Sequence, residues 1–470
     1  MSSLQISAEE FRQLSKELLD LACGYLEQMD SRPIFPGAHP ELEDLWRAPL
    51  TEIGMGKHAL AALRSVIEGA RVQNGRFFGY VLGSGEPVAA LGDLLASVLN
   101  QNVTAWRSSP AAVSIERTVV GWLASAIGCA GFTGSLTGGG SSANLMALAM
   151  AREKSCPANE TGLQSRTPVL YASEEAHMSI GKAVALLGLG RENLRLIATG
   201  ADFRMLPKEL DAAIRKDQAE GRIPIAVVAS AGTVNTGSID PLREIAEIAA
   251  GRGLWLHVDG AYGALAAIAV PERFAGLNLA DSISLDPHKW LYQPLDCGCL
   301  LYRDANAARC AFAHTGDYAK AFSEDPVEGF AFFEESLELS RRFRALKVWL
   351  SLRYHGMEAF RAAIRDDLAS ARRLAAQIRA HPELEMIAEG ELSAVCFRYR
   401  AAGREDDLNR INAAILKRVV EAGRVYLTNA TLSGKFCLRA CIVNHRTTEA
   451  DVDAVVPEVL RAAGMESPSP

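Results

Sequence analysis

The chain has 470 residues, of which 49% are hydrophobic and 22% are charged. This length is sufficient for two or three domains, and the composition is that of a folded globular protein rather than a disordered chain. The 49 basic and 56 acidic side chains give a net charge of −7 without a long run of either sign, so nucleic acid is not an expected partner. Polar residues, glycine and proline repeatedly interrupt the apolar stretches. We therefore expect no membrane-spanning segment and no membrane partner.

The nine cysteines are scattered between Cys23 and Cys441 and lack the spacing of a zinc site. Their odd number, together with the absence of a signal peptide from this sequence, predicts reduced thiols and a cytoplasmic location. Cys297 and Cys299 lie two positions apart, so in a strand both side chains would point to one face. A redox-active pair is a weaker interpretation of that spacing than two reduced thiols on one face of a strand.

An amphipathic helix is expected at the start of the chain. Ser7 and Glu10 have the spacing of a capping box, and apolar residues then recur at helical intervals as far as Met29. A proline-rich stretch after Ser31 ends this helix. Its apolar stripe must be covered, either by the same chain or by a partner subunit.

Helical stretches alternate with short β-rich apolar runs between about residues 110 and 305, which predicts an α/β domain with a largely parallel sheet. One crossover helix is marked by Asp240 as its N-cap, Pro241 in its first turn and Gly251 at its end. The strands expected in this region are 167–173, 194–199, 225–230, 254–259, 282–285 and 298–303.

The chain after residue 340 is first rich in helical periodicity and then shows strands near 392–399 and 436–443 and a last amphipathic helix. This order predicts a smaller C-terminal α+β domain. The expected division is an N-terminal helical segment at 1–85, a large α/β domain at 86–355 and a small domain at 356–470.

A glycine-rich loop at 138–142 directly precedes a helical pattern that begins at Ala143. Free N–H groups at the start of a helix favour an anion, so this loop predicts a phosphate site, whereas a flexible turn is the alternative. Gly138 and Gly140 also match the dinucleotide fingerprint, but no strand ending in an acidic residue follows at the required distance. A P-loop lacks support, because no Gly-Lys-Ser/Thr follows the glycines.

Asp259 lies at the carboxyl end of an expected strand, where ligands bind in open α/β sheets. Its alternative role is to cap a helix or turn. His257 is on the same face of that strand, and its apolar surroundings predict a hydrogen-bonded core histidine rather than a ligand.

Lys289 follows another strand and is flanked by His288 and Trp290. A desolvated lysine in such a cleft can lose its proton and form a Schiff base, although an exposed lysine at a strand end is commoner. His257, Asp259, Asp286 and His288 could instead hold a metal, but their spacings are not those of metal motifs and Lys289 would have no role. Pyridoxal 5'-phosphate (PLP) uses the phosphate loop, the carboxylate and the lysine together, so we expect PLP and no metal.

Four segments then resemble the PLP-dependent group II decarboxylases, and aromatic L-amino-acid decarboxylases in particular, over nearly the whole chain. The lysine motif is DSISLDPHKWLYQPLDCGCLLYRD at 281–304, and the aspartate motif is HVDGAYG at 257–263. The other two segments are YASEEAHMSIGKA at 171–183 and SRRFRALKVW at 340–349. The resemblance implies a fold-type I enzyme like aspartate aminotransferase, with a mostly parallel seven-stranded sheet. It also implies a homodimer with active sites at the interface, in which the N-terminal segment is exchanged.

The resemblance further implies roles for individual residues. Lys289 would bind the cofactor aldehyde, Asp259 would pair with the pyridine nitrogen, and His177 would stack on the ring opposite Ala261. Asp286 departs from the asparagine of several aromatic decarboxylases, and a carboxylate beside a phosphate needs a donor between them or another orientation. Val234 and Asn235, which follow Thr233, depart from the threonines often found in relatives. The remaining cofactor contacts implied are Gly140, Ser141, Thr233, Asp286 and His288.

The weakly periodic segment 311–335 is expected to be a mobile lid. Tyr318 in HTGDYAK matches the catalytic tyrosine that in this family protonates the substrate carbon after CO2 leaves, and relatives with Phe at that position make aldehydes. The resemblance therefore implies a true decarboxylase, with Lys289, Tyr318, His177 and Asp259 as its catalytic residues. An exposed loop tyrosine is the plainer interpretation.

The substrate is expected to be an aromatic L-amino acid of the tyrosine, DOPA, phenylalanine and tryptophan class. Phe78, Tyr80 and Trp106 fall in the region that forms the substrate pocket of relatives, although each could be a core residue. Ser340 corresponds to a position where some plant relatives carry Ser with phenolic and Gly with indolic substrates. The stretch VLGSGEP at 81–87 departs from well-known aromatic enzymes, so an acidic substrate such as glutamate or aspartate stays open.

Rival functions make different predictions. A PLP aminotransferase would share Lys289 and Asp259 but would need an arginine for the substrate carboxylate and would form keto acid. An aldehyde-forming relative would release aldehyde instead of amine. A dehydrogenase or a metal hydrolase would carry no lysine-bound chromophore, and a non-enzymatic scaffold is disfavoured by the intact catalytic set.

Overall fold

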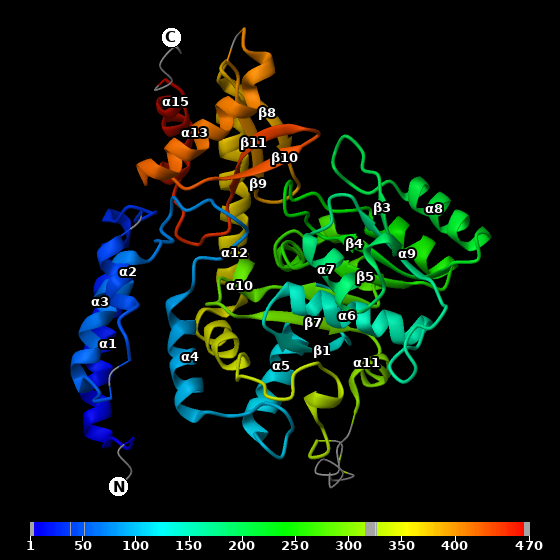
Figure 1. Ribbon diagram of the computed structural model, residues 1–470, viewed down its shortest axis with the longest axis horizontal. Coiled ribbons are helices and arrows are strands. Elements are labelled where there is room, and N and C mark those ends of the chain that lie inside the picture. Colours follow the sequence, from blue (N-terminus) through cyan, green and yellow to red (C-terminus); the bar gives the residue numbers. More distant parts are fainter. Residues whose placement is uncertain are drawn as a thin grey trace.

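The computed structural model describes residues 4–37, 39–50, 52–314, 325, 327–401 and 403–464. A seven-stranded sheet in the order β1-β7-β6-β5-β4-β2-β3 forms the centre of the large domain (Figure 1). β7 is antiparallel to both of its neighbours, and the other adjacent pairs are parallel, so the mostly parallel sheet is confirmed. The strands are β1 (Thr133–Thr137), β2 (Pro168–Ser173), β3 (Leu194–Ile197), β4 (Ile223–Ser230), β5 (Trp255–Asp259), β6 (Ser282–Leu285) and β7 (Gly298–Tyr302).

The six expected strands of this domain are all present, and β1 is the strand that the sequence pattern does not mark. β1 has the short sequence TGSLT, in which a glycine interrupts any alternation. That glycine is required by packing, because a Cβ on Gly134 would lie 1.9 Å from the carbonyl oxygen of Leu300 on β7. Its pairing with β7 is therefore a tertiary requirement rather than a local propensity.

Helices cover both faces of the sheet, because neighbouring strand residues point in opposite directions. Val169 and Tyr171 of β2 join one core with α5, α8 and α9, whereas Leu170 and Ala172 join the other with α6, α7 and α11. The two-sided cover is that of an α/β domain. These helices are α5 (Pro110–Ala126), α6 (Gly140–Ser155), α7 (Met178–Leu186), α8 (Pro207–Ala219), α9 (Leu242–Gly251) and α11 (Ala305–Phe312).

The expected crossover helix is α9, but its first residues differ from the prediction. Helix α9 begins at Leu242, and Pro241 occupies the N-cap position. Asp240 is buried, and its carboxylate accepts the backbone N–H groups of Ser230 at 2.7 Å and Met205 at 2.8 Å. Asp240 therefore joins the end of β4 to the segment before α8 rather than capping the helix.

The small domain is built on an antiparallel sheet in the order β10-β11-β9-β8. The two expected strands are β9 and β11, and the partners on either side of them are not marked by the sequence. Helix α12 (Ala345–Ala380) runs from the large domain to this sheet and is interrupted at Gly356, where φ is 75° (Figure 1). The remaining elements are β8 (Leu384–Glu389), β9 (Ala394–Tyr399), β10 (Thr428–Leu432), β11 (Lys435–Cys441), α13 (Leu408–Ala422), α14 (Glu449–Asp453) and α15 (Val455–Gly464).

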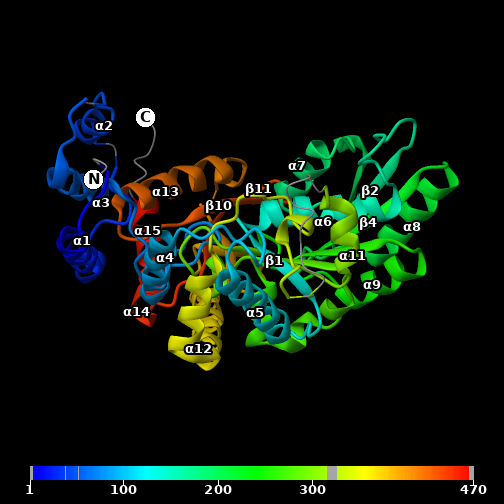
Figure 2. The same ribbon diagram turned by 90° about the horizontal axis from the view of Figure 1, so that it is seen from below.

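The N-terminal helices α1 to α3 lie at one side of the molecule in both views (Figures 1 and 2). Ser7 caps α1 as expected, since its hydroxyl accepts the backbone N–H of Glu10 at 3.0 Å. Helix α1 has no buried residue, and its apolar stripe is only partly covered by the described part of this chain. None of the helices in the described ranges is long and apolar enough to cross a membrane. These elements are α1 (Ala8–Gln28), α2 (Pro40–Trp46), α3 (Leu63–Gly69) and α4 (Pro87–Leu99).

Candidate active site

A cavity of about 290 Å³ lies where β4, β5 and β6 end and α6 begins. This is the edge of an α/β sheet at which ligands are expected. It collects most of the residues proposed from the sequence, which come from four separate segments of the chain. The predicted residues on its wall are Gly140, Ser141, His177, Asp259, Ala261, Asp286, His288 and Lys289.

The glycine loop enters the cavity in a conformation that side chains would prevent. Gly139 has φ of 144°, and a Cβ on Gly140 would lie 2.6 Å from the Cβ of Ala261 and 3.1 Å from Asp286 Oδ2. Helix α6 begins at Gly140, and the backbone N–H groups of Gly140 and Ser141 have no partner among the described residues. These two donors and the helix dipole form an anion site at the cavity wall.

The Asp259 carboxylate, only 8% exposed, is held by hydrogen bonds to both oxygens. Oδ1 accepts the backbone N–H of Ala261 at 3.2 Å and the hydroxyl of Ser284 at 3.1 Å. Oδ2 accepts the side-chain amide of Asn144 at 2.9 Å. This set of donors fixes the orientation of the carboxylate at the cavity wall.

His177 occupies the N-cap position of α7 and forms another part of the wall. Its Nδ1 lies 2.9 Å from the hydroxyl of Ser179 and accepts the backbone N–H of Ser179 at 3.3 Å. Burial lowers the pKa of His177, which favours the neutral imidazole. A neutral ring with one nitrogen fixed by Ser179 is a flat, oriented surface.

Lys289 belongs to α10 (Pro287–Trp290), a single turn that follows β6. Its Nζ lies 2.9 Å from Asp286 Oδ2, while Asp286 Oδ1 is buried without a hydrogen-bond partner in the described part of the chain. The imidazole of His288 donates from Nδ1 to the carbonyl of Cys297 at 2.7 Å, and burial lowers the pKa of His288. His288 thus fastens α10 to the start of β7.

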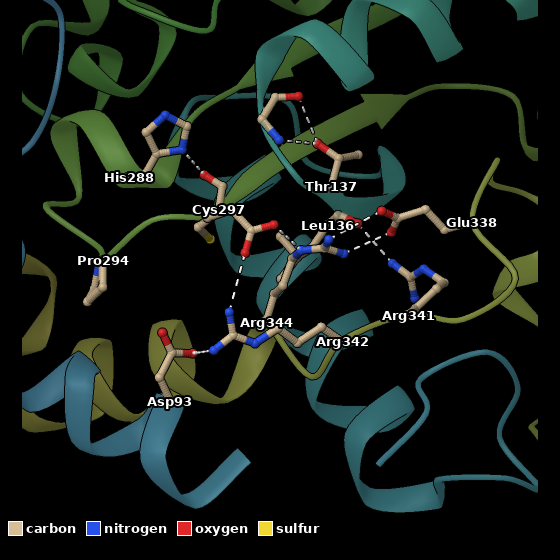
Figure 3. Close-up of polar contacts among 12 residues, drawn as sticks. Asp93, Leu136, Thr137, His288, Pro294, Cys297, Glu338, Arg341, Arg342 and Arg344 are labelled. Atoms are coloured by element: carbon tan, nitrogen blue, oxygen red, sulfur yellow. Dashed lines mark hydrogen bonds and ion pairs between the residues drawn. The ribbon is translucent and has the colours of Figure 1, made fainter. Parts of the chain in front are cut away.

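Ion pairs lie behind this wall and involve the segment 340–349 (Figure 3). Arg344 contacts Asp296 at 2.9 Å and Glu338 at 2.8 Å, and Asp296 directly follows Leu295 of the cavity wall. Arg341 is fully buried and pairs with Glu116 of α5. The arginine-rich motif therefore anchors the segments around the cavity and contributes no side chain to its wall.

Thr233, a predicted cofactor contact, does not line the cavity. Its hydroxyl lies 2.7 Å from that of Thr236 and accepts the backbone N–H of Ser238 at 3.2 Å. The side chain is thereby held inside its own turn, and the neighbours Gly232 and Val234 line the cavity instead.

The predicted substrate-pocket residues lie outside the cavity wall of this chain. Phe78 has no exposed surface and packs in the core of the small domain, because its backbone bonds to Tyr426 and Cys441 beside β11. Its side chain therefore does not reach this cavity, and its assignment to the substrate pocket stays a prediction. Tyr80 is 46% exposed, and its hydroxyl lies 3.2 Å from that of Tyr426. Trp106 packs against the main core, and Ser340 is exposed.

Asn144, Ser179 and Ser284 support the site but were not singled out from the sequence. Asn144 is one helical turn after Gly140, on the same helix face, within an otherwise apolar stretch. Such a buried amide in an alanine-rich helix needs a polar partner, which is the signal that could have found it. Ser179 follows His177 by two residues, but its contact with Asn144 depends on tertiary structure.

Comparison with known proteins identifies the family. The model described as "Pyridoxal-dependent decarboxylase conserved domain" matches residues 64–400. The chain belongs to the pyridoxal-dependent decarboxylase family. This decarboxylase is 34% identical over 470 residues to the aromatic-L-amino-acid decarboxylase of Bacillus atrophaeus, covering 97% of this chain and 96% of the relative. It is 33% identical over 462 residues to the 4-hydroxyphenylacetaldehyde synthase of Rhodiola rosea, covering 93% and 92%.

Solved structures agree with this result. Oryza sativa TDC, whose structure contains PLP and tryptamine, superposes with a TM-score of 0.92 at 28% identity and with 99% of each chain covered. The fold-type I architecture and the PLP cofactor expected from the sequence are confirmed. The protein is thus a PLP-dependent amino-acid decarboxylase.

The cavity of the decarboxylase fits PLP on its own geometry. Two free N–H groups at the start of α6 suit a phosphate, a fixed carboxylate at Asp259 suits a protonated pyridine nitrogen, and Lys289 supplies an amine. Both ring nitrogens of His257 are occupied by hydrogen bonds to Ser282 and Asn144. Over the described ranges, no group of three or more His, Cys, Asp and Glu side chains could hold a metal ion.

Proposed function

We propose that this enzyme decarboxylates an aromatic L-amino acid to the corresponding amine and CO2. The observation that carries the proposal is the meeting of Lys289, Asp259 and His177 on one cavity wall beside the phosphate site. The aromatic class is supported by relatives whose names specify aromatic, tryptophan and tyrosine decarboxylases. Within this class we favour phenolic substrates, on the basis of Ser340.

Each proposed role follows from what the side chain can do. PLP supplies an electron sink for the pair of electrons left when the carboxylate departs. Asp259 stabilises a positive charge on the pyridine nitrogen, because three donors hold its carboxylate in place. Gly140 and Ser141 would hold the phosphate with their backbone N–H groups, and His177 and Ala261 would hold the ring. Lys289 would supply the amine that holds the cofactor aldehyde.

Tyr318 lies outside the described residues, and its role rests on the sequence resemblance. We propose that its hydroxyl delivers the proton to the substrate carbon. If this proton reaches the substrate carbon, the product is an amine; an aldehyde is the other possible product. The Rhodiola rosea relative is named as a synthase of an aldehyde.

Product analysis tests the proposal. The purified holoenzyme is incubated with single amino acids, namely tyrosine, DOPA, phenylalanine, tryptophan, glutamate and aspartate, and the products are identified by mass spectrometry. Amine and CO2 in equal amounts from an aromatic substrate are expected. Amine formed from glutamate or aspartate alone would overturn the aromatic assignment, and keto acid or aldehyde would overturn amine formation.

We also propose a cytoplasmic homodimer with active sites at its interface. Helix α4 exposes Leu91, Leu95 and Val98, each at least 50% exposed, and α1 has no buried residue. Apolar faces of this extent are typical of protein interfaces. The nine cysteines are free, which suits a reducing compartment. Light scattering coupled to gel filtration should give twice the mass of one chain, and a monomeric mass would contradict the proposal.

A further inference from the structure

A chain of buried hydrogen bonds runs beneath the cavity from β5 to α7. The indole N–H of Trp255 donates to the hydroxyl of Ser282 at 2.8 Å, and that hydroxyl lies 3.0 Å from His257 Nδ1. His257 Nε2 lies 2.9 Å from Asn144 Oδ1. The Asn144 amide nitrogen then contacts both Asp259 Oδ2 and the Ser179 hydroxyl at 2.9 Å. Asn144 is therefore the branch point of the chain.

The direction of every bond in this chain follows from its fixed members. The Asp259 carboxylate can only accept, so Asn144 must turn its N–H group towards Asp259 and its carbonyl oxygen towards His257. His257 must then carry its hydrogen on Nε2 to donate to that oxygen. At the other end, the Trp255 indole can only donate, which leaves the Ser282 hydroxyl hydrogen for His257 Nδ1.

The same logic fixes His177 at the cavity. His257 has no exposed surface, and burial lowers its pKa to about 4, so it is neutral, with one donating and one accepting nitrogen. The Ser179 hydroxyl accepts from Asn144, so its own hydrogen is available to His177 Nδ1 at 2.9 Å. Nδ1 also accepts the Ser179 backbone N–H, and the ring hydrogen of neutral His177 is thus on Nε2.

We propose that Asn144 is a positioning residue that orients the two cavity side chains Asp259 and His177 together. One N–H of its amide holds the Asp259 carboxylate, and the other directs the Ser179 hydroxyl to donate to His177 Nδ1, where this bond adds to that from the Ser179 backbone N–H. The inference rests on the proposed function, in which these two side chains contact the cofactor ring. Asn144 itself acts through its neighbours.

The two branches can be cut separately. Asn144→Leu removes both, Ser179→Ala removes the hydroxyl that links Asn144 to His177, and Ser179→Thr keeps a hydroxyl. We expect Asn144→Leu to lower kcat roughly 10- to 100-fold with KM changed less than about threefold, because orientation rather than binding is lost. Ser179→Ala should lower kcat less, and Ser179→Thr should restore it. Asn412→Leu, which removes another fully buried helix amide in the small domain, controls for losing a buried asparagine as such.

Two spectroscopic measurements separate orientation from general damage. Solid-state 15N spectra of histidine-labelled protein without cofactor should show His177 protonated at Nε2 alone, assigned by comparison with His177→Gln. The backbone N–H of residue 179 keeps Nδ1 an acceptor in every variant, so the Nδ1 signal should shift towards that of a more weakly hydrogen-bonded nitrogen in Asn144→Leu and Ser179→Ala and should keep its wild-type position in Ser179→Thr. The visible absorbance of bound PLP should change in Asn144→Leu, which affects Asp259, and should stay unchanged in Ser179→Ala.

Each outcome has a defined meaning. Protonation of wild-type His177 at Nδ1, or unchanged 15N spectra in both variants, would overturn the proposal. If Asn144→Leu does not fold, the Ser179→Ala and Ser179→Thr pair tests the branch to His177 by the same spectra, and identical spectra for that pair would overturn it. If instead the wild-type protein showed the expected tautomer and bound no PLP, the proposed function would fail while the inferred hydrogen-bond chain would stand.

Discussion

Lys289 Nζ lies 2.9 Å from the carboxylate of Asp286, which directly precedes the same helical turn. The Asp286 carboxylate lies against the phosphate site, since a Cβ on Gly140 would be 3.1 Å from its Oδ2. The remaining oxygen of Asp286 is buried without a hydrogen-bond partner in the described ranges. The carboxylate therefore both holds the lysine and opposes an incoming anion.

Asp286→Asn should tighten cofactor binding. Removing one negative charge beside a phosphate relieves repulsion at short range, and we expect the Kd for PLP to fall about tenfold, which corresponds to about 1.4 kcal/mol. Titration of cofactor-free protein with PLP, followed by quenching of tryptophan fluorescence, measures the change. Asp211→Asn, which removes a carboxylate from the ion pair with Arg252 on the helical surface, is the matched control. Weaker binding by Asp286→Asn would show that holding Lys289 outweighs the repulsion.

Lys289→Ala should abolish the covalent attachment of the cofactor. Borohydride treatment of the wild-type enzyme with PLP should fix the cofactor to the peptide that contains residue 289, and the variant should carry no fixed cofactor and no decarboxylase activity. Peptide mass spectrometry makes the measurement. An adduct of unchanged position or amount in the variant would refute the assignment of Lys289.

Tyr318→Phe should change the product rather than prevent substrate binding. Without the phenolic proton donor we expect the amine yield to fall by roughly 10²- to 10⁴-fold and aldehyde to become the main product, with KM little changed. Product ratios from mass spectrometry, together with oxygen consumption, provide the test. An unaltered amine yield would remove Tyr318 from the mechanism.

Arg341→Met should destabilise the fold strongly because it leaves Glu116 charged in the core. Both side chains are at most 1% exposed, and Arg341 also donates to the carbonyl groups of Val103 and Leu136. Breaking a buried pair on one side costs about 3–5 kcal/mol. Arg342→Met, at an arginine 44% exposed, should cost less than about 1 kcal/mol. Urea unfolding compares the two, and equal losses would show that burial of the Arg341 pair carries no extra cost.

Asp367 predicts a pH-dependent stability. It is fully buried, accepts the hydroxyl of Tyr292 at 2.8 Å, and burial raises its pKa to about 8. The unfolded carboxyl has a pKa of about 3.9, so between about pH 4 and pH 8 the folded protein retains a proton that the unfolded chain releases, and stability falls as pH rises. Asp367→Asn cannot ionise. Its stability relative to wild type should therefore rise between about pH 5 and about pH 8, by at most about 4 kcal/mol.

Thermal unfolding at both pH values tests this prediction, with the exposed neighbour Asp366→Asn as control. The control should show the same pH dependence as the wild type. A difference between Asp367→Asn and wild type that is independent of pH would show that Asp367 is ionised in the fold at both pH values.

Local sequence determined the strand that ends in Asp259 and the strand that precedes Lys289, because short runs rich in β-forming and apolar residues are typical of buried strands. The glycine-rich loop at 138–142 could also be recognised from the sequence. Backbone that must approach other groups closely needs residues without a Cβ. The family motifs around these residues predicted the PLP cofactor and the decarboxylase reaction, and the comparisons confirm both.

Tertiary structure decided the features whose cause lies far along the chain. β1 pairs with β7 across more than 150 residues, and the hydrogen bond between Asn144 and Asp259 spans 115 residues. Phe78 is aromatic, as a pocket residue would be, but it packs in the core of the small domain. Its backbone N–H donates to the carbonyl of Tyr426 there. Sequence periodicity reports which face of an element is buried, whereas the partner on that face, and the direction of a buried polar side chain, are set only when distant segments pack together.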